Sequence, residues 1–169
     1  VWSFAAVGRE PGAEMRAVLE AVVARVGKDM TPRGVSMTVW GYAKLGREPR
    51  VEAWVALNAA VTIVVKHMDQ QELGSTMWGL ASFRREPGAK AWAAMEAAVT
   101  QMGPKMTPHD VAQAAWSFAT IGREPGAEAW AALEAAVMRV NPEPQAIANV
   151  TWTYLMFAVA RGVPLPSCY

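Results

Sequence analysis

Four sets of mostly polar or small side chains recur along the sequence, and the internal spacing of each set is four, four and three residues. On a helix this spacing keeps the members of a set on one face. The sets, which we together name the polar stripe, are Arg33, Met37, Gly41 and Lys44; Gln71, Ser75, Gly79 and Ser82; His109, Gln113, Ser117 and Thr120; and Gln145, Asn149, Thr153 and Met156. Amide and hydroxyl groups both donate and accept hydrogen bonds, so such a row predicts a surface that reads nucleobases one at a time. An ordinary solvated helix face would carry the same residue types, and this alternative stays open.

Three lysines, Lys28, Lys66 and Lys105, fall near corresponding positions ahead of the first three sets. A row of cations along one edge can follow a nucleic-acid backbone, with each lysine neutralising one phosphate. Cations are also favourable at the C-terminal ends of helices, so ordinary surface charge explains these lysines equally well. The net charge of +1 argues against a purely electrostatic nucleic-acid binder.

Residues that could carry catalysis or bind a metal are few and scattered. The two histidines, His67 and His109, are far apart in the sequence, and no cysteine or carboxylate lies at metal-ligand spacing around both. The single cysteine, Cys168, excludes an intramolecular disulfide and a cysteine-rich zinc module. The sequence contains no phosphate-binding glycine loop, nucleophile elbow or zinc signature. We therefore expect no enzymatic activity, no metal site and no cofactor.

The composition excludes two further classes of protein. Hydrophobic residues make up 53% of the 169 residues and charged residues 18%, which is too apolar and too weakly charged for a disordered chain. The longest uncharged stretch, residues 144–160, is short and is interrupted by polar side chains. We therefore expect no membrane span.

A 38-residue repeat positions the polar stripe. Three kinds of marker share this period: a first tryptophan series, a second tryptophan series and the tripeptide Arg-Glu-Pro. The first series is Trp2, Trp40, Trp78 and Trp116, with Trp152 two positions short of the next step; the second is Trp54, Trp92 and Trp130; the tripeptides begin at Arg9, Arg47, Arg85 and Arg123. A fixed period of this length indicates a stacked array of similar structural units.

Each unit reads as two helices joined by a tight turn. In the clearest unit the first helix is predicted over residues 107–121, with Thr107 as N-cap and Gly122 just past the end. The second is predicted over residues 125–140, with Pro125 in the first helical position. The same pattern predicts first helices over residues 31–45 and 69–83, and no strand-like alternation persists anywhere.

One helix pair cannot bury its apolar face alone, so the pairs must stack. The sequence therefore predicts an all-α fold, an α-solenoid of about four and a half helix-turn-helix repeats. Residues 1–30 are expected to form a partial first repeat; residues 31–68, 69–106 and 107–142 repeats two to four; and residues 143–169 the first helix of a fifth repeat and a tail. Both tryptophan series are expected in the stacked core. The Arg-Glu-Pro turns are expected to join neighbouring repeats, with a ligand-facing row of arginines as the alternative.

The stretch from Trp116 to Leu133, WSFATIGREPGAEAWAAL, resembles the octotricopeptide repeat, and the resemblance covers the chain from Val1 to about Ala160. The resemblance implies an organellar protein of the chloroplast or mitochondrion that binds single-stranded RNA and acts in transcript processing, stability or translation. It also implies that RNA contacts come from the first helix of each repeat, here Met37, Ser75, Gln113 and Asn149.

The chain departs from the family pattern in three places. The second helix is preceded by a single proline, Arg16 stands where the second tryptophan series would place an aromatic ring, and the connector before Gln145 is two residues shorter. Some family members belong to organellar ribosomes, so a structural scaffold that binds rRNA or a ribosomal or other organellar protein is the alternative function. About four to five repeats would cover only four to five nucleotides, so we expect the array to continue in a longer protein.

Overall fold

The computed structural model describes residues 1–139, 144, 147–148, 151–153 and 155. In this part of the chain every regular element is helical and no strand occurs, so the prediction of an all-α fold is confirmed. The α-helices are α1 (Trp2–Ala6), α2 (Ala13–Val26), α3 (Pro32–Lys44), α4 (Val51–Val64), α5 (Gln70–Ser82), α6 (Ala89–Met102), α7 (Pro108–Ile121) and α8 (Ala127–Arg139). Short 3-10 turns, η1 (Gly27–Asp29), η2 (Val65–His67) and η3 (Gly103–Lys105), follow α2, α4 and α6. None of the described helices is long and apolar enough to cross a membrane.

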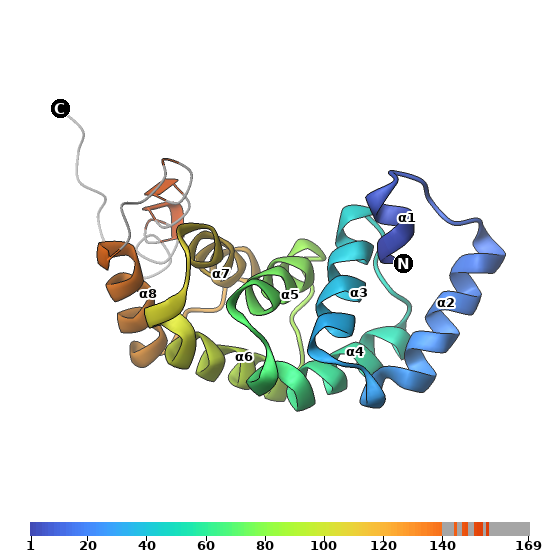
Figure 1. The fold of residues 1–169 in the computed structure, drawn as a ribbon, viewed down its shortest axis with the longest axis horizontal. Helices are drawn as coiled ribbons and strands as arrows, with labels where there is room; N and C mark the ends of the chain where they lie inside the picture. Colours follow the sequence, from blue (N-terminus) through green and yellow to red (C-terminus); the bar gives the residue numbers. More distant parts are fainter. Residues whose placement is uncertain (140–143, 145–146, 149–150, 154, 156–169) are drawn as a thin grey trace.

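The helices form two layers that follow an arc (Figure 1). Helices α1, α3, α5 and α7 pack side by side in the inner layer, on the hollow side of the arc. Helices α2, α4, α6 and α8 pack side by side in the outer layer. Because α3, α5 and α7 begin at 38-residue steps, the sequence period corresponds to one inner and one outer helix.

Local capping chemistry fixes where the inner helices begin and end. The predicted N-cap Thr107 is confirmed, and with Asp110 it forms a capping box. Asp69 caps α5 in the same way, since its Oδ1 accepts from the backbone N–H of Glu72 at 2.7 Å. At the other end of α7, Gly122 has a left-handed backbone with φ of 73°, which confirms its predicted place.

The prediction that Pro125 begins the second helix is wrong, because α8 starts at Ala127. The equivalent turn before α4 shows the reason. Arg50, which follows Pro49, has an extended backbone with ψ of 164° and serves as the N-cap of α4. Each proline therefore precedes the cap and is buried in the turn. The predicted end of the helix at residue 140 lies outside the described residues.

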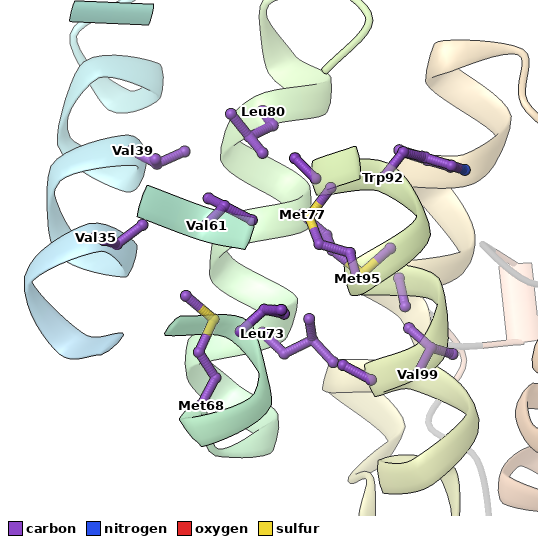
Figure 2. Packing of buried hydrophobic residues seen from close by; sticks show 14 of the residues in the cluster. Val35, Val39, Val61, Met68, Leu73, Met77, Leu80, Trp92, Met95 and Val99 are labelled. Carbon is purple, nitrogen blue, oxygen red and sulfur yellow. The ribbon is translucent and has the colours of Figure 1, made fainter. Parts of the chain in front are cut away.

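The hydrophobic core fills the space between the two layers. Figure 2 shows side chains of α3, α4, α5 and α6 meeting there, among them Val39, Val61 and Met77. The second tryptophan series belongs to this core, as predicted, since Trp54 is 5% exposed and Trp92 is 1% exposed. Both rings pack edge to face on a phenylalanine of an inner-layer segment; the pairs are Trp54 with Phe83, at 5.9 Å between centroids, and Trp92 with Phe118, at 5.0 Å.

The first tryptophan series does not belong to the core, and that prediction is wrong. Trp2 is 45% exposed, and Trp40, Trp78 and Trp116 are each half-buried. On α3 the core-facing position is taken by Val39, which is fully buried. The next residue along a helix is turned by about 100°, so the side chain of Trp40 leaves the core for the inner surface.

The Arg-Glu-Pro turns are linked to one another by ion pairs across consecutive repeats. In each pair an arginine hydrogen-bonds the glutamate of the preceding tripeptide: Arg47 Nε to Glu10 Oε1 at 2.6 Å, Arg85 Nη1 to Glu48 Oε1 at 2.8 Å, and Arg123 Nη1 to Glu86 Oε1 at 2.6 Å. The guanidinium groups of Arg85 and Arg123 also lie over buried tryptophan rings of the preceding repeat. These contacts support the interpretation that the turns join neighbouring repeats.

One of these pairs carries a defined pH dependence. The hydrogen bond from Arg47 lowers the pKa of Glu10 from its usual value. A carboxylate with a lowered pKa in the folded state stabilises the fold above the ordinary carboxyl pKa. This contribution is lost as the pH falls through the lowered pKa of Glu10, so acid weakens the Arg47–Glu10 pair.

Replacing Arg85 with glutamine should lower the free energy of unfolding by about 1 kcal/mol. The substitution removes a partly exposed ion pair, worth roughly 0–1 kcal/mol, and a cation over Trp54, worth roughly 0.5–1 kcal/mol. Urea unfolding at low and high salt measures both parts, since only the ion pair is strongly screened. Arg9→Gln is the matched control, because Arg9 makes no ion pair with the described residues. Equal losses of unfolding free energy in Arg85→Gln and Arg9→Gln would contradict the stabilising role of the ion pairs between repeats.

Candidate nucleic-acid interface

Two hollows open on the surface of the inner layer. The first, of about 360 Å³, lies over α3 and α5 and is bordered by α1. It gathers four members of the polar stripe with two tryptophans: Arg33, Met37, Gln71 and Ser75 with Trp2 and Trp40. The fold thus brings stripe residues of two successive repeats onto one shared surface, as their spacing predicts.

The second hollow, of about 590 Å³, lies over α5 and α7. Ser82 and Thr120 of the polar stripe line it, together with Trp78 and Trp116 of the first tryptophan series. Arg84 and Trp152 complete its wall. Both hollows are thus lined by indole rings, small polar side chains and one arginine.

The inner-face tryptophans lie close enough to act together. The ring centroids of Trp78 and Trp116 are 6.4 Å apart, and the rings are tilted by 31°. In the preceding repeat, the ammonium nitrogen of Lys44 lies 5.5 Å from the ring centroids of both Trp40 and Trp78. We name these tryptophans, with Trp2 and Trp152, the tryptophan row. The row presents aromatic faces that already attract a cation in the free protein.

The middle of the polar stripe is covered by neighbouring helices. Gly41, Gly79 and Ser117 are buried. A Cβ atom at Gly79 would come within 2.6 Å of the Val39 side chain and within 3.2 Å of its backbone. These positions let the inner helices approach closely, so they are spacers and offer no groups to a ligand.

Several polar groups of the stripe are used or covered within the fold. The hydroxyl of Ser82 donates to the Trp78 carbonyl at 2.7 Å. The Thr120 hydroxyl oxygen is buried and has no hydrogen-bond partner among the described residues. The Gln113 carbonyl oxygen is also buried, in space left by Gly74 on α5. Hydrogen-bonding capacity on the open face therefore comes mainly from the N-terminal halves of the helices.

The remaining predicted residues occupy the edges of the surface. His109, at the start of α7, is exposed, as are Arg33 and Gln71 at the equivalent positions. The three predicted phosphate contacts are exposed in the 3-10 turns that precede α3, α5 and α7; they are Lys28, Lys66 and Lys105. Gln145, Asn149 and Met156 lie outside the described residues, and Thr153 is buried.

The two hollows differ in charge: among the described residues Arg84 is the charged side chain that lines the second, whereas Arg33 lies with Asp69 and Glu72 at the first. Arg33, Lys44 and Arg84 are exposed on this surface. The acidic residues at the first hollow are Asp69 and Glu72, and both carboxylates accept hydrogen bonds from the backbone in the capping box of α5. Within the described ranges no group of three or more His, Cys, Asp or Glu side chains could hold a metal ion.

No protein-family model, curated protein or solved structure matches this chain.

Sequence reasoning missed two features of this surface. Trp40 follows Met37 by three residues and precedes Lys44 by four, a helical spacing that already placed the ring on the stripe. Arg84 lies 38 residues after Gly46 and 38 residues before Gly122. The 38-residue period therefore shows an arginine at a position that holds glycine in the neighbouring repeats. Both signals were present in the sequence.

Proposed function

We propose that this chain is a non-catalytic α-solenoid that binds single-stranded RNA along its inner layer. The observation that carries the proposal is the tryptophan row, which places Trp40, Trp78 and Trp116 on the same surface as the exposed part of the polar stripe. The side-by-side packing of equivalent helices at 38-residue steps supports the solenoid arrangement.

The chemistry of the surface matches an unpaired strand. Bases of single-stranded nucleic acid expose their faces and stack on aromatic rings, with about 1–3 kcal/mol per base. Arg33 and Lys44 lie beside the rings and supply charge for the phosphates. Gln71 and Ser75 supply hydrogen-bonding groups at the first hollow. A duplex hides its base faces, so the same surface is poorly suited to double-stranded RNA.

The resemblance to the octotricopeptide repeat supports the same conclusion and extends it. On that basis we propose a chloroplast or mitochondrial location and a role in transcript processing, stability or translation. The exposed members of the stripe, such as Arg33, Gln71 and His109, are the proposed base contacts, and the three lysines of the 3-10 turns are the proposed phosphate contacts.

A random single-stranded RNA pool tests the proposal directly. The protein should retain RNA at low salt, and retention should weaken with salt by a slope near −0.7 per phosphate contacted. A duplex of the same composition should compete poorly. If the protein retained no RNA at any salt concentration tested, the proposed RNA-binding function would be wrong. Sequencing the retained pool then shows whether the surface prefers particular bases.

A protein-binding scaffold is the second candidate, because the outer layer exposes apolar side chains. Met15, Val18 and Val22 on α2, and Val51, Val55 and Ile63 on α4, are all exposed. Adjacent exposed apolar side chains are typical of a contact with another protein. Binding of a protein partner that depends on Val55 and Ile63, by a chain that retains no RNA, would favour the scaffold.

A further inference from the structure

The backbone at Arg84 adopts a conformation that the other repeats reserve for glycine. A residue one or two positions past the end of each inner helix has a positive φ: 64° at Gly8, 62° at Gly46, 51° at Arg84 and 73° at Gly122. Glycine adopts this left-handed conformation readily, whereas a residue with a Cβ atom is strained there. The fold therefore accepts backbone strain at Arg84 that a glycine would relieve. Such strain, where it is observed, often accompanies a functional side chain.

The side chain of Arg84 contributes to the second hollow. It is exposed and lines the hollow with Trp78 and Trp116. Within the part of the chain that the structure describes, its guanidinium makes no ion pair or side-chain hydrogen bond. The next residue, Arg85, is bound to Glu48 and lies over Trp54. Since Arg85 fulfils the structural role in this turn, Arg84 is left available for a ligand.

Two of the three gaps between the described inner helices, α3 to α5 and α5 to α7, each hold one cation beside a pair of tryptophans. Between α3 and α5 the cation is Lys44, next to Trp40 and Trp78. At the position equivalent to Lys44, α5 has Ser82, whose hydroxyl is bound to its own helix. In the gap between α5 and α7 the cation is Arg84 instead. The same combination of charge and aromatic face is thus supplied from two different sequence positions.

We propose that the second hollow is a nucleotide subsite for single-stranded RNA, in which a base stacks on the Trp78–Trp116 platform and Arg84 pairs with the adjacent phosphate. The centroid separation of 6.4 Å is that of a directly packed aromatic pair, so the two rings form one platform for a base on their open side. A guanidinium binds two phosphate oxygens at once through its planar fork. This subsite rests on the proposed RNA-binding function.

Arg84→Gly separates the functional role from a structural one, because the two effects have opposite signs. Relief of the left-handed strain should raise Tm by about 2–4 °C. Loss of the phosphate contact should weaken RNA binding about tenfold and reduce the salt slope by about 0.7. Binding of a fluorescent single-stranded oligonucleotide from the retained pool, measured by anisotropy at several salt concentrations, gives both affinity and slope. Arg84→Lys should retain the slope and lose part of the affinity, since lysine keeps the charge without the fork.

Arg9→Gly is the matched control. Arg9 is an exposed arginine beside Gly8 in the first turn and makes no ion pair with the described residues, so its removal should leave affinity and slope unchanged. RNA binding that Arg84→Gly leaves intact would overturn the subsite while the RNA-binding function stands. A protein that retains no RNA would overturn both. Equal competition by poly-glutamate peptide would assign the hollow to an acidic protein segment and would also overturn the subsite.

Discussion

Replacing Trp92 with alanine should destabilise the protein by about 3–5 kcal/mol, enough to unfold much of a marginally stable chain. Trp92 is 1% exposed and lies where α6, α7 and the Arg-Glu-Pro turn meet. The Trp92 ring packs edge to face on Phe118, with 5.0 Å between the ring centroids. The Arg123 guanidinium lies 5.5 Å from the centroid of the Trp92 ring. Truncation removes the contact between two consecutive repeats as well as the apolar burial. In a stacked array such an interface supports both neighbours.

The controls for this prediction come from the same residue and from the tryptophan row. The Trp92 indole nitrogen is buried without a hydrogen-bond partner among the described residues, so Trp92→Phe loses no hydrogen bond and keeps most of the apolar contact. It should cost less than about 1.5 kcal/mol. Trp40→Ala, on the half-buried inner surface, should cost less than Trp92→Ala. Urea midpoints at constant m-value measure all three, and equal losses for Trp40→Ala and Trp92→Ala would contradict the assignment of the two series.

The helix boundaries could be predicted from the sequence because they are set by local chemistry. Thr107 and Gly122 cap α7 through their own side chain and backbone, without help from distant residues. The predicted place of Pro125 is wrong because one residue stands between the proline and the helix, as the extended Arg50 does before α4. Helix ends of this kind depend on one or two backbone angles, and composition alone does not fix them.

The two tryptophan series show where the sequence carries less information. Both have the same residue type and the same period, so periodicity alone does not separate a core position from a surface position. The distinction depends on which face of each inner helix meets the outer layer, where Val39 and Leu80 occupy the core positions. Gln113 is a similar case, since the burial of its carbonyl oxygen depends on the space that Gly74 leaves on the neighbouring helix.

Replacing Trp78 and Trp116 together with alanine should weaken single-stranded RNA binding by about 10- to 100-fold, the loss of one stacked base. Each stacked base contributes about 1–3 kcal/mol, and both rings belong to the platform of the second hollow. Anisotropy with a fluorescent oligonucleotide at fixed salt measures the loss. Because much of the binding energy would come from stacking, the wild-type protein should tolerate base changes better than a surface that reads bases through hydrogen bonds alone.

The double phenylalanine variant, Trp78→Phe with Trp116→Phe, is the control that separates stacking from packing. Both rings are half-buried, so each variant needs its Tm measured before its affinity is compared. The phenylalanine pair keeps aromatic faces and should retain more affinity than the alanine pair at equal folded fraction. Ile63→Ala, on the exposed outer layer, should leave affinity unchanged. If both double variants and Ile63→Ala bind RNA as the wild type does, the strand lies elsewhere on the molecule and the inner face is not its site.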